Sequence, residues 1–349
     1  MKIGVDAREL QGKPTGVGRL LSAVLAAWTT MPEASGHEVV LLAPEGPSRG
    51  GTVWEQRTLP QLVRAAGADV LLCPAYSGPV VPPVPMVLLI HDVSFAAHPE
   101  WFGWREGARR RTTVRLAARS AARVVTISEF SKREIVAHLG LPESSIVVAY
   151  PGVPTFVRGT AQPPSDSPPR RPVLFVGSIF QRRHIPELLD GFALLARAHP
   201  EVDLIIVGDN RTSPRIDIAE RASSAGLSGR VRVQHYITDE DLHAAYARAS
   251  AFTFLSDYEG FGLTPLEAIA AGLPVLLLDT PGAREVFGDA AYYIESPSPV
   301  LIQDALEVLL FDAEERDRLR EAGRRLLPRY SWTSFAQRIL DTLKESAGA

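Results

Sequence analysis

Short apolar runs alternate with stretches of helical periodicity along almost the whole chain, and this alternation predicts an α/β architecture with buried strands. In the first half we expect strands at Lys2–Val5, Val39–Leu42, Val70–Cys73, Met86–Ile90, Val124–Ile127 and Ile146–Ala149. In the second half we expect them at Val173–Val176, Asp203–Val207, Val231–Gln234, Ala251–Leu255 and Val275–Leu278. Helical spacing of apolar residues predicts helices between them, among others at Arg19–Trp28, Pro186–Ala198, Arg215–Ala225 and Asp239–Ala249.

The length of 349 residues exceeds what one hydrophobic core usually supports, so we expect two domains. The segment RGTAQPPSDSPPRRP, residues 158–172, is rich in proline, serine and charge and cannot build a core, which predicts an interdomain linker. The predicted domains are therefore 1–157 and 173–328. A last helix, Trp332–Lys344, is expected after the capping residue Ser331 in the segment 329–349.

Composition narrows the classes of protein. The apolar fraction of 46% is ordinary for a globular protein, and the net charge of −3 gives no global attraction to nucleic acid or acidic membranes. The one cysteine, Cys73, lies in an apolar run, so we expect it to be buried and inert in a reducing compartment. There is no signal-peptide pattern at the N-terminus and no run of ~20 apolar residues, so a soluble cytoplasmic protein is expected.

The stretch Ser256–Gly272 is a polar, glycine-bearing loop that leads into a helix. Thr264 suits the N-cap position, and Pro265 suits the first helical position. Glu267, three residues after the cap, would complete a capping box, so the helix is predicted to start at Thr264. Gly272 offers a left-handed stop. A helix N-terminus behind a glycine loop is a ready site for phosphate.

Two glutamates flank this helix start, and the local pattern leaves their role open. Glu259 and Glu267 could accept hydrogen bonds from sugar hydroxyls. Alternatively, Glu267 only completes the capping box and Glu259 is a solvated loop acid, which the local pattern alone favours.

Four further residues allow a functional and a structural interpretation. Gly16, in the glycine loop TGVG after the first strand, could approach a phosphate or serve only the turn; no full GxGxxG is present. His91 ends a strand, where open α/β sheets bind ligands, but it could equally be structural. Arg182 and Arg183, between a strand and a helix, could neutralise a diphosphate or be a surface pair.

Trp104–Arg123 is the most basic stretch of the chain. On a helix its arginines share a broad face that could meet anionic lipid or an anionic acceptor. A solvated helix face is the simpler interpretation, because the aromatic residues Trp101, Phe102 and Trp104 lie at one end only.

Four motifs in this order, TGVG, IHD, GSIFQRR and EGFGLTPLE, resemble those of the retaining GT4-type, group 1 glycosyltransferases, including bacterial mannosyltransferases. The last motif resembles the EX7E signature of that family. The resemblance spans nearly the whole chain and implies the GT-B fold, with two Rossmann-like, doubly wound domains facing a cleft. It also implies that the C-terminal helix crosses back to the first domain.

The resemblance assigns roles to individual residues. Glu259 and His91 would be catalytic and lie at the donor sugar, while Glu267 would hold the ribose. Gly16, Arg182 and Arg183 would contact the donor phosphates; His184 stands where the family often has Asn or Gly, and His98 is an acceptor-side possibility. The remaining nucleotide contacts would come from Ile237, beside Tyr236, and from Phe261, Gly262, Leu263 and Thr264.

The implied activity is retaining transfer of a hexosyl or pentosyl group from a UDP- or GDP-type sugar. The acceptor would be a saccharide or natural product, as in assembly of a cell-surface polysaccharide or an oligosaccharide antibiotic. No DxD pair ends a strand, so no metal or other cofactor is expected, and the chain is expected to be a monomer or weak dimer. One alternative is a nucleotide-sugar-binding protein without transferase activity. A nicotinamide oxidoreductase would need an acidic ribose-binding residue after the glycine loop, which is not found.

Overall fold

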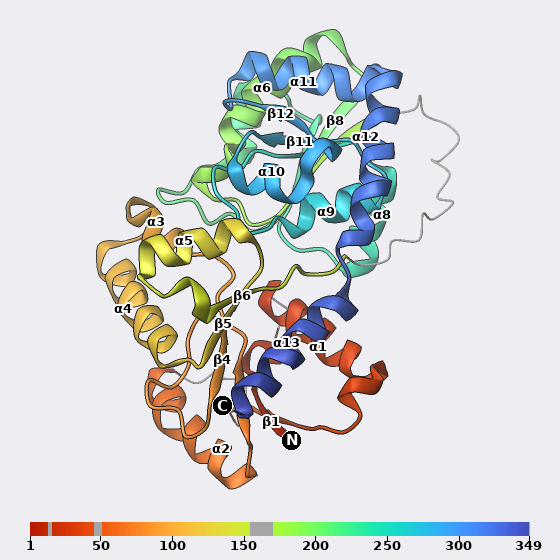
Figure 1. The fold of residues 1–349 in the computed structure, drawn as a ribbon. Coiled ribbons are helices and arrows are strands. Elements are labelled where there is room, and N and C mark those ends of the chain that lie inside the picture. Colours follow the sequence, from red (N-terminus) through yellow and green to blue (C-terminus); the bar gives the residue numbers. More distant parts are fainter. Residues whose placement is uncertain (13–15, 45–50, 154–169, 349) are drawn as a thin grey trace. The chain divides into compact units, whose positions relative to one another are not determined.

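The chain forms two compact units in a computed structural model that describes residues 1–12, 16–44, 51–153 and 170–348 (Figure 1). Unit 1 consists of Met1–Gly152 together with Tyr330–Ala349, and unit 2 consists of Val153–Arg329. Most of the predicted linker, 158–169, lies outside the described residues. Its last two residues, Arg171 and Pro172, already belong to the first strand of unit 2.

Unit 1 is built on a six-stranded parallel sheet with the strand order β2-β1-β3-β4-β5-β6. Its strands are β1 (Lys2–Asp6), β2 (Glu38–Leu42), β3 (Val70–Cys73), β4 (Met86–Leu89), β5 (Arg123–Thr126) and β6 (Ile146–Val148). Its helices are α1 (Gly16–Thr30), α2 (Leu59–Ala66), α3 (Ser94–Ala97), α4 (Trp104–Ser120), α5 (Glu129–Leu139) and α13 (Trp332–Ala347).

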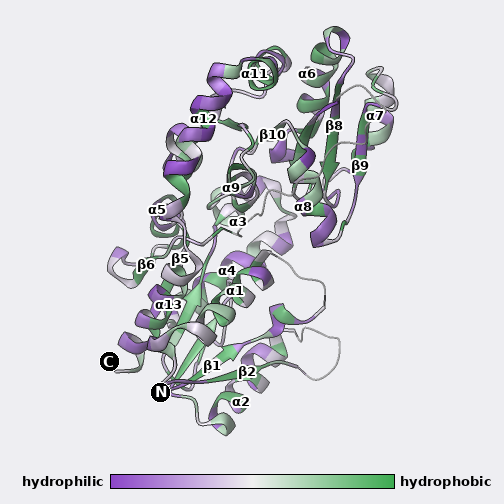
Figure 2. Ribbon diagram, turned by 90° about the vertical axis from the view of Figure 1, so that its right-hand side faces the viewer, coloured by the Kyte–Doolittle hydropathy of each residue, from purple (hydrophilic) through white to green (hydrophobic). Residues whose placement is uncertain are grey.

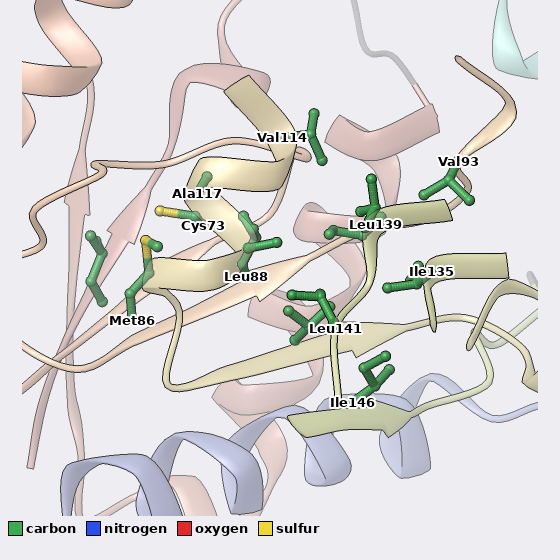
Figure 3. Packing of buried hydrophobic residues seen from close by; sticks show 14 of the residues in the cluster. Cys73, Met86, Leu88, Val93, Val114, Ala117, Ile135, Leu139, Leu141 and Ile146 are labelled. Atoms are coloured by element: carbon green, nitrogen blue, oxygen red, sulfur yellow. The ribbon is translucent and has the colours of Figure 1, made fainter. Parts of the chain in front are cut away.

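The strands of unit 1 are apolar because both faces of a parallel sheet are covered by helices. One core cluster lies under α4 and α5, where Cys73, Met86, Leu88, Ala117 and Ile135 pack together without exposure (Figure 3). The predicted burial of Cys73 is confirmed, and this burial raises the pKa of its thiol. Ser128 caps α5, because its side chain accepts from the Ser131 N–H over 2.9 Å.

The C-terminal helix α13 belongs to the core of unit 1. It packs on α1 and on the sheet at β3, β4 and β5. Trp28 Nε1 donates to Ala336 O over 3.0 Å, and Phe335, Ile339 and Leu340 are buried. The side chain of Ser331 caps this helix, as predicted, by accepting from the Ser334 N–H.

Unit 2 contains a second six-stranded parallel sheet, with the strand order β12-β11-β10-β7-β8-β9. Its strands are β7 (Arg171–Val176), β8 (Val202–Val207), β9 (Val231–Gln234), β10 (Ala251–Phe254), β11 (Val275–Leu278) and β12 (Tyr292–Ile294). Its helices are α6 (Ile185–Ala198), α7 (Ile218–Ser224), α8 (Asp239–Arg248), α9 (Leu263–Ala270), α10 (Pro281–Phe287), α11 (Pro299–Phe311) and α12 (Ala313–Leu326). The strand β8 is coloured as hydrophobic in Figure 2, as expected of a buried parallel strand.

The predicted fold class, two doubly wound α/β domains, is confirmed by these two parallel sheets. Two local predictions are wrong. Helix α9 begins at Leu263 with Gly262 as its N-cap, so Thr264 is not the cap and the predicted capping box does not form. Arg123 belongs to β5 rather than to the basic helix. None of the helices in the described part of the chain combines the length and apolar composition needed to cross a membrane.

Candidate active site

The order of strands marks the place where unit 2 is expected to bind a ligand. β7 is the first strand of this sheet and lies between β8 and β10. Later strands extend the sheet from β8 to β9 on one side and from β10 to β12 on the other. The strand order therefore switches between β7 and β10, and open α/β sheets bind ligands at the carboxyl ends of the strands at this point.

Two predicted site residues meet there. Arg183 follows β7 and Glu259 follows β10. Nε and Nη2 of Arg183 donate to Oε1 of Glu259 over 3.0 and 2.8 Å, and the Ser256 hydroxyl donates to the same oxygen over 2.8 Å. The two charged side chains are only 11% and 27% exposed, so water screens their attraction less than at an open surface.

The neighbouring Arg182 and Arg183 both contact the ring of Phe180. The guanidinium of Arg182 is 4.3 Å from the centre of the Phe180 ring, and that of Arg183 is 5.6 Å from it. Arg183 also lies 4.6 Å from the Phe254 ring. Cation–π contacts of this kind orient both guanidinium groups at the switch point.

Two glycines make this corner possible. Gly177, directly after β7, has a φ of 148°, and a Cβ there would come within 2.6 Å of Arg183 Nη1. Gly208, after β8, has a φ of 150°, and a Cβ there would come within 1.9 Å of the Gly177 carbonyl oxygen. A larger residue at position 208 would displace the backbone of Gly177, and one at position 177 would push the Arg183 guanidinium aside.

His184 continues the cationic corner in a left-handed conformation, with a φ of 51°. Asn and Gly tolerate this conformation better than other residues, and the resemblance places these residues at this position. Nε2 of His184 is 2.8 Å from Asp257 Oδ2, while the Asp257 N–H donates to Arg182 O over 3.0 Å. Burial opposes protonation of the ring, but Asp257 and Glu187 outweigh it and raise the pKa of His184.

The start of α9 supplies backbone donors close to Glu259. Gly262, with a φ of 88°, turns the chain into the helix, and a Cβ there would lie 3.0 Å from Cζ of Phe287. The N–H groups of Leu263 and Thr264 precede the intrahelical bond from Leu266 to Gly262, so they point out of the helix end. Such an end carries partial positive charge and suits an anion.

Glu267 lies one turn further along α9 and is buried, at 9% exposure. The hydroxyl of Tyr246, on α8, donates to Glu267 Oε2 over 2.9 Å and also lies 3.3 Å from Thr264 O. Glu267 is therefore held by a neighbouring helix, whereas the predicted capping box would have tied it to its own helix start.

The space beside these residues is small. A pocket of about 20 Å³ is lined by Glu259, Phe261, Gly262 and Phe287, among others. Phe261 is 2% exposed, so its side chain packs inside unit 2. Ile237 is half-buried in the loop after β9, at the same carboxyl edge of the sheet. The pocket therefore holds no more than a water-sized group.

In unit 1, His91 follows β4 and is 7% exposed. Its Nε2 is 2.8 Å from Pro74 O, so Nε2 carries the hydrogen and donates it. Burial lowers the pKa of His91 although the Pro74 carbonyl opposes this effect. The ring of Tyr76 packs edge-on against it with 5.3 Å between ring centres, which fixes the imidazole, and the lowered pKa favours its neutral form.

Tyr76 itself is held in a left-handed conformation, with a φ of 61°. Its hydroxyl donates to Asp92 Oδ2 over 2.9 Å, and the Arg110 guanidinium lies 5.2 Å from its ring centre. Burial raises the pKa of Asp92, but hydrogen bonds from Ser94 and Tyr76 outweigh it and leave the pKa below its ordinary value. Tyr76 therefore joins His91 and Asp92 into one packed group.

Gly16 is the first residue of α1 and is exposed. A Cβ placed on it would meet no described atom within 4 Å, so packing does not require glycine there. Residues 13–15 of the same loop lie outside the described residues. Across the described ranges, no three His, Cys, Asp or Glu side chains gather into a metal-binding group.

The structure thus brings Arg182, Arg183 and Glu259 together, and it places His91 and Gly16 in the other unit. The sequence interpretation missed Ser256 and Tyr246, whose hydroxyls hold the two glutamates. Ser256 carried a signal, since it opens the loop that was singled out. The sequence gives no such signal for Tyr246, because an aromatic residue at helical spacing is most often an ordinary core residue.

Two family models match consecutive parts of this chain. The model described as glycosyltransferase family 4 matches residues 22–155, and the model described as glycosyl transferases group 1 matches residues 161–326. The chain belongs to the group 1, family 4 glycosyltransferases. The predicted family is confirmed, and Arg182, Arg183 and Glu259 of unit 2 lie in the part of this glycosyltransferase that the group 1 model matches.

Two relatives of this glycosyltransferase are mannosyltransferases by name. O-antigen chain mannosyltransferase B of Escherichia coli is 27% identical over 282 residues, which cover 74% of this chain and 70% of that protein. GDP-mannose:cellobiosyl-diphosphopolyprenol alpha-mannosyltransferase of Komagataeibacter xylinus is 29% identical over 171 residues, or 48% of this chain. That match spans only 44% of the relative's length.

Solved structures confirm the fold of this glycosyltransferase. Anabaena HepE in complex with UDP-glucose aligns with a TM-score of 0.76 and 19% identity over 99% of both chains. WaaG, a glycosyltransferase involved in lipopolysaccharide biosynthesis, aligns with a TM-score of 0.73 and 17% identity over 98% of this chain and 99% of that chain. The fold is therefore of the GT-B type, while the predicted cleft depends on the placement of the two units and stays a prediction.

Proposed function

We propose that this glycosyltransferase moves a hexosyl or pentosyl group from a nucleoside diphosphate sugar to a saccharide or natural-product acceptor, retaining the anomeric configuration and using no divalent metal. The names of relatives support a sugar donor of the GDP-mannose kind, and a solved neighbour was obtained with UDP-glucose. Assembly of a cell-surface polysaccharide or an oligosaccharide antibiotic in the cytoplasm fits this activity.

The observation that carries the proposal is the convergence of Arg182, Arg183 and Glu259 at the switch point of unit 2, beside the start of α9. Two guanidinium groups and a helix N-terminus supply positive charge where a sheet of this topology binds ligands. This set suits the negative charge of a diphosphate. The resemblance places a lysine at position 183, so Arg183 gives this set a forked rather than a point-like donor.

The roles of the residues follow from their positions and from the resemblance. The diphosphate would take hydrogen bonds from Arg182, Arg183 and the backbone N–H groups of Leu263 and Thr264. Glu267, at the next turn of α9, would accept from the ribose hydroxyls. Glu259 would orient the sugar. The assignments of His91 to the sugar, Gly16 to a phosphate and Ile237 to the base depend on the resemblance.

In the proposed reaction, the bond between the sugar C1 and the leaving diphosphate oxygen breaks with oxocarbenium-like character. The acceptor hydroxyl attacks C1 from the same face, and its proton passes to the departing phosphate oxygen. The cations at the switch point stabilise the charge that develops on the diphosphate. Because these groups supply the positive charge, a metal is not required in this proposal.

The test is a panel of GDP- and UDP-sugars, assayed with and without EDTA for donor hydrolysis and for transfer to acceptors. NMR of the product then gives the anomeric configuration. Transfer with retention that persists in EDTA is expected. Binding of a donor with neither hydrolysis nor transfer would instead favour a nucleotide-sugar-binding protein, and inversion or loss of activity in EDTA would refute the mechanism.

A further inference from the structure

Helix α4 carries an unusual surplus of positive charge that the proposed reaction does not use. It contains six arginines and one acidic residue, Glu106, which gives a net charge of +5 on a chain whose total is −3. The arginines are Arg105, Arg109, Arg110, Arg111, Arg115 and Arg119. Within the described part of the chain, none of them forms an ion pair with a carboxylate; Arg110 instead packs against the rings of Tyr76, Phe95 and Phe102.

Helix α12 shows how the same chain builds an arginine-rich helix whose exposed face is neutralised by its own acidic residues. It has five arginines and four acidic residues, a net charge of +1, and is largely coloured as hydrophilic in Figure 2. Arg318 pairs with Glu315 over 2.6 Å, Arg320 with Asp317 over 3.2 Å, and Glu321 pairs with both Arg324 and Arg325. Pairs at this spacing stabilise a solvated helix, and α4 has none of them.

The exposed face of α4 combines these cations with apolar side chains. Residues 105, 109, 112, 116 and 119 are spaced by three or four positions, share one face and are all exposed. On this face Leu116 is 44% exposed, and Trp104, at the start of the helix, is 75% exposed. Ser120 Oγ donates to Val80 O over 2.7 Å, which places Val81, 78% exposed, at the other end.

A groove between α4 and α5 adds a place for an anionic group. Its volume is about 400 Å³, and Arg111, Arg115, His138 and Leu116 are among the residues that line it. Arg115 Nε donates to Leu139 O over 3.0 Å, which fixes this guanidinium at the groove. Cations and apolar groups therefore line the same depression.

We propose that the α4 surface, comprising the exposed face of α4, Val81 and the groove, docks this glycosyltransferase on an anionic lipid bilayer. The cations match the negative head groups, and the apolar residues Trp104, Leu116 and Val81 enter the interface without spanning it. The sequence alone placed apolar anchors at one end of the helix; the structure adds one midway and one at the far end. A nucleic acid has no apolar layer to receive these side chains.

The test is co-sedimentation of the full chain with vesicles of phosphatidylcholine, with and without phosphatidylglycerol. Binding is expected only with phosphatidylglycerol and should weaken as salt is added. The double variant Arg109→Gln/Arg119→Gln removes two exposed charges at little cost in helix propensity. Its partition coefficient should fall roughly 25-fold, from roughly fivefold per basic residue.

The double variant Arg324→Gln/Arg325→Gln is the matched control, because it makes the same change in net charge on α12. It should bind vesicles within about twofold of the native chain, since its arginines lie outside the proposed surface. Circular dichroism checks that both variants are folded. Equal losses in the two variants, or equal binding to vesicles without phosphatidylglycerol, would overturn the proposal. So would tighter binding to a single-stranded oligonucleotide than to vesicles.

Discussion

In the variant Glu259→Gln, the amide keeps the shape of the side chain that Arg183 contacts but removes its negative charge. In the structure, this carboxylate already neutralises the Arg183 guanidinium, so an incoming diphosphate competes with Glu259 for it. We therefore expect the variant to bind a nucleoside diphosphate at least as tightly as the native chain. It should transfer sugar more slowly, because Glu259 is proposed to orient the sugar.

The size of the expected changes in affinity and kcat follows from the hydrogen bonds of one atom, Glu259 Oε1. Glu259 Oε1 accepts two hydrogen bonds from Arg183 and one from Ser256. A hydrogen bond to a charged group contributes about 1.5–3 kcal/mol, against about 1 kcal/mol for a neutral pair. Loss of the charge should therefore release about 1 kcal/mol for diphosphate binding, which is roughly a fivefold gain in affinity. Loss of one charged contact to the sugar should reduce kcat by roughly 10- to 100-fold.

Titration calorimetry with GDP and UDP measures the affinity, and steady-state transfer measures kcat. Glu240→Gln removes the same charge from an exposed position on α8 and should change either value by less than about twofold. A Glu259→Gln variant that loses tenfold in diphosphate affinity and keeps native kcat would refute the reasoning. It would show that Glu259 holds the nucleotide rather than the sugar.

Three further predictions concern single residues. Tyr246→Phe removes the hydroxyl that donates to the carboxylate proposed to hold the ribose; it should weaken diphosphate binding roughly threefold to tenfold in calorimetry, and an unchanged affinity would contradict that role. Gly262→Ala should destabilise unit 2 by about 1–2 kcal/mol or more in urea unfolding, because φ is 88° and the Cβ would lie 3.0 Å from Phe287; Gly226→Ala, with a φ of 77° and no atom within 4 Å, should cost less. Because burial lowers the pKa of His91, the unfolded chain takes up a proton at a higher pH than the folded chain does. The stability that the neutral His91 contributes is therefore present above about pH 6.5 and is lost as the pH falls. The free energy of unfolding of His91→Gln, measured in urea, should depend less on pH than that of the native chain.

Much of the fold was predictable because its signals are local. Buried parallel strands are short apolar runs, and the capping serines Ser128 and Ser331 stand directly before the helices that they cap. The N-cap of α9 was not predictable, because Thr264, Pro265 and Glu267 form a strong local capping signal two residues too late. Gly262 takes the cap because its left-handed backbone turns the chain beside Phe287, and that contact is tertiary.

Helix α12 escaped prediction for a different reason. Only Leu319, Ala322, Gly323 and Leu326 of its residues are buried, so its apolar stripe is narrow and charge dominates its pattern. In the site, the types of the charged residues were predictable but their partners were not. Arg183 and Glu259 are 76 positions apart, and only the order of strands brings β7 beside β10.

Because α13 completes unit 1, the two units cannot finish folding in the order in which they are translated. All of Val153–Arg329 leaves the ribosome before Trp332 does, which takes roughly ten to thirty-five seconds at ordinary elongation rates. Throughout that time the sheet of unit 1 lacks the helix that covers β3 to β5, and Trp28 lacks the carbonyl of Ala336. A nascent chain released from the ribosome before Trp332 is added would carry a folded unit 2 and an incomplete unit 1, and the exposed sheet of unit 1 would be accessible to chaperones and proteases.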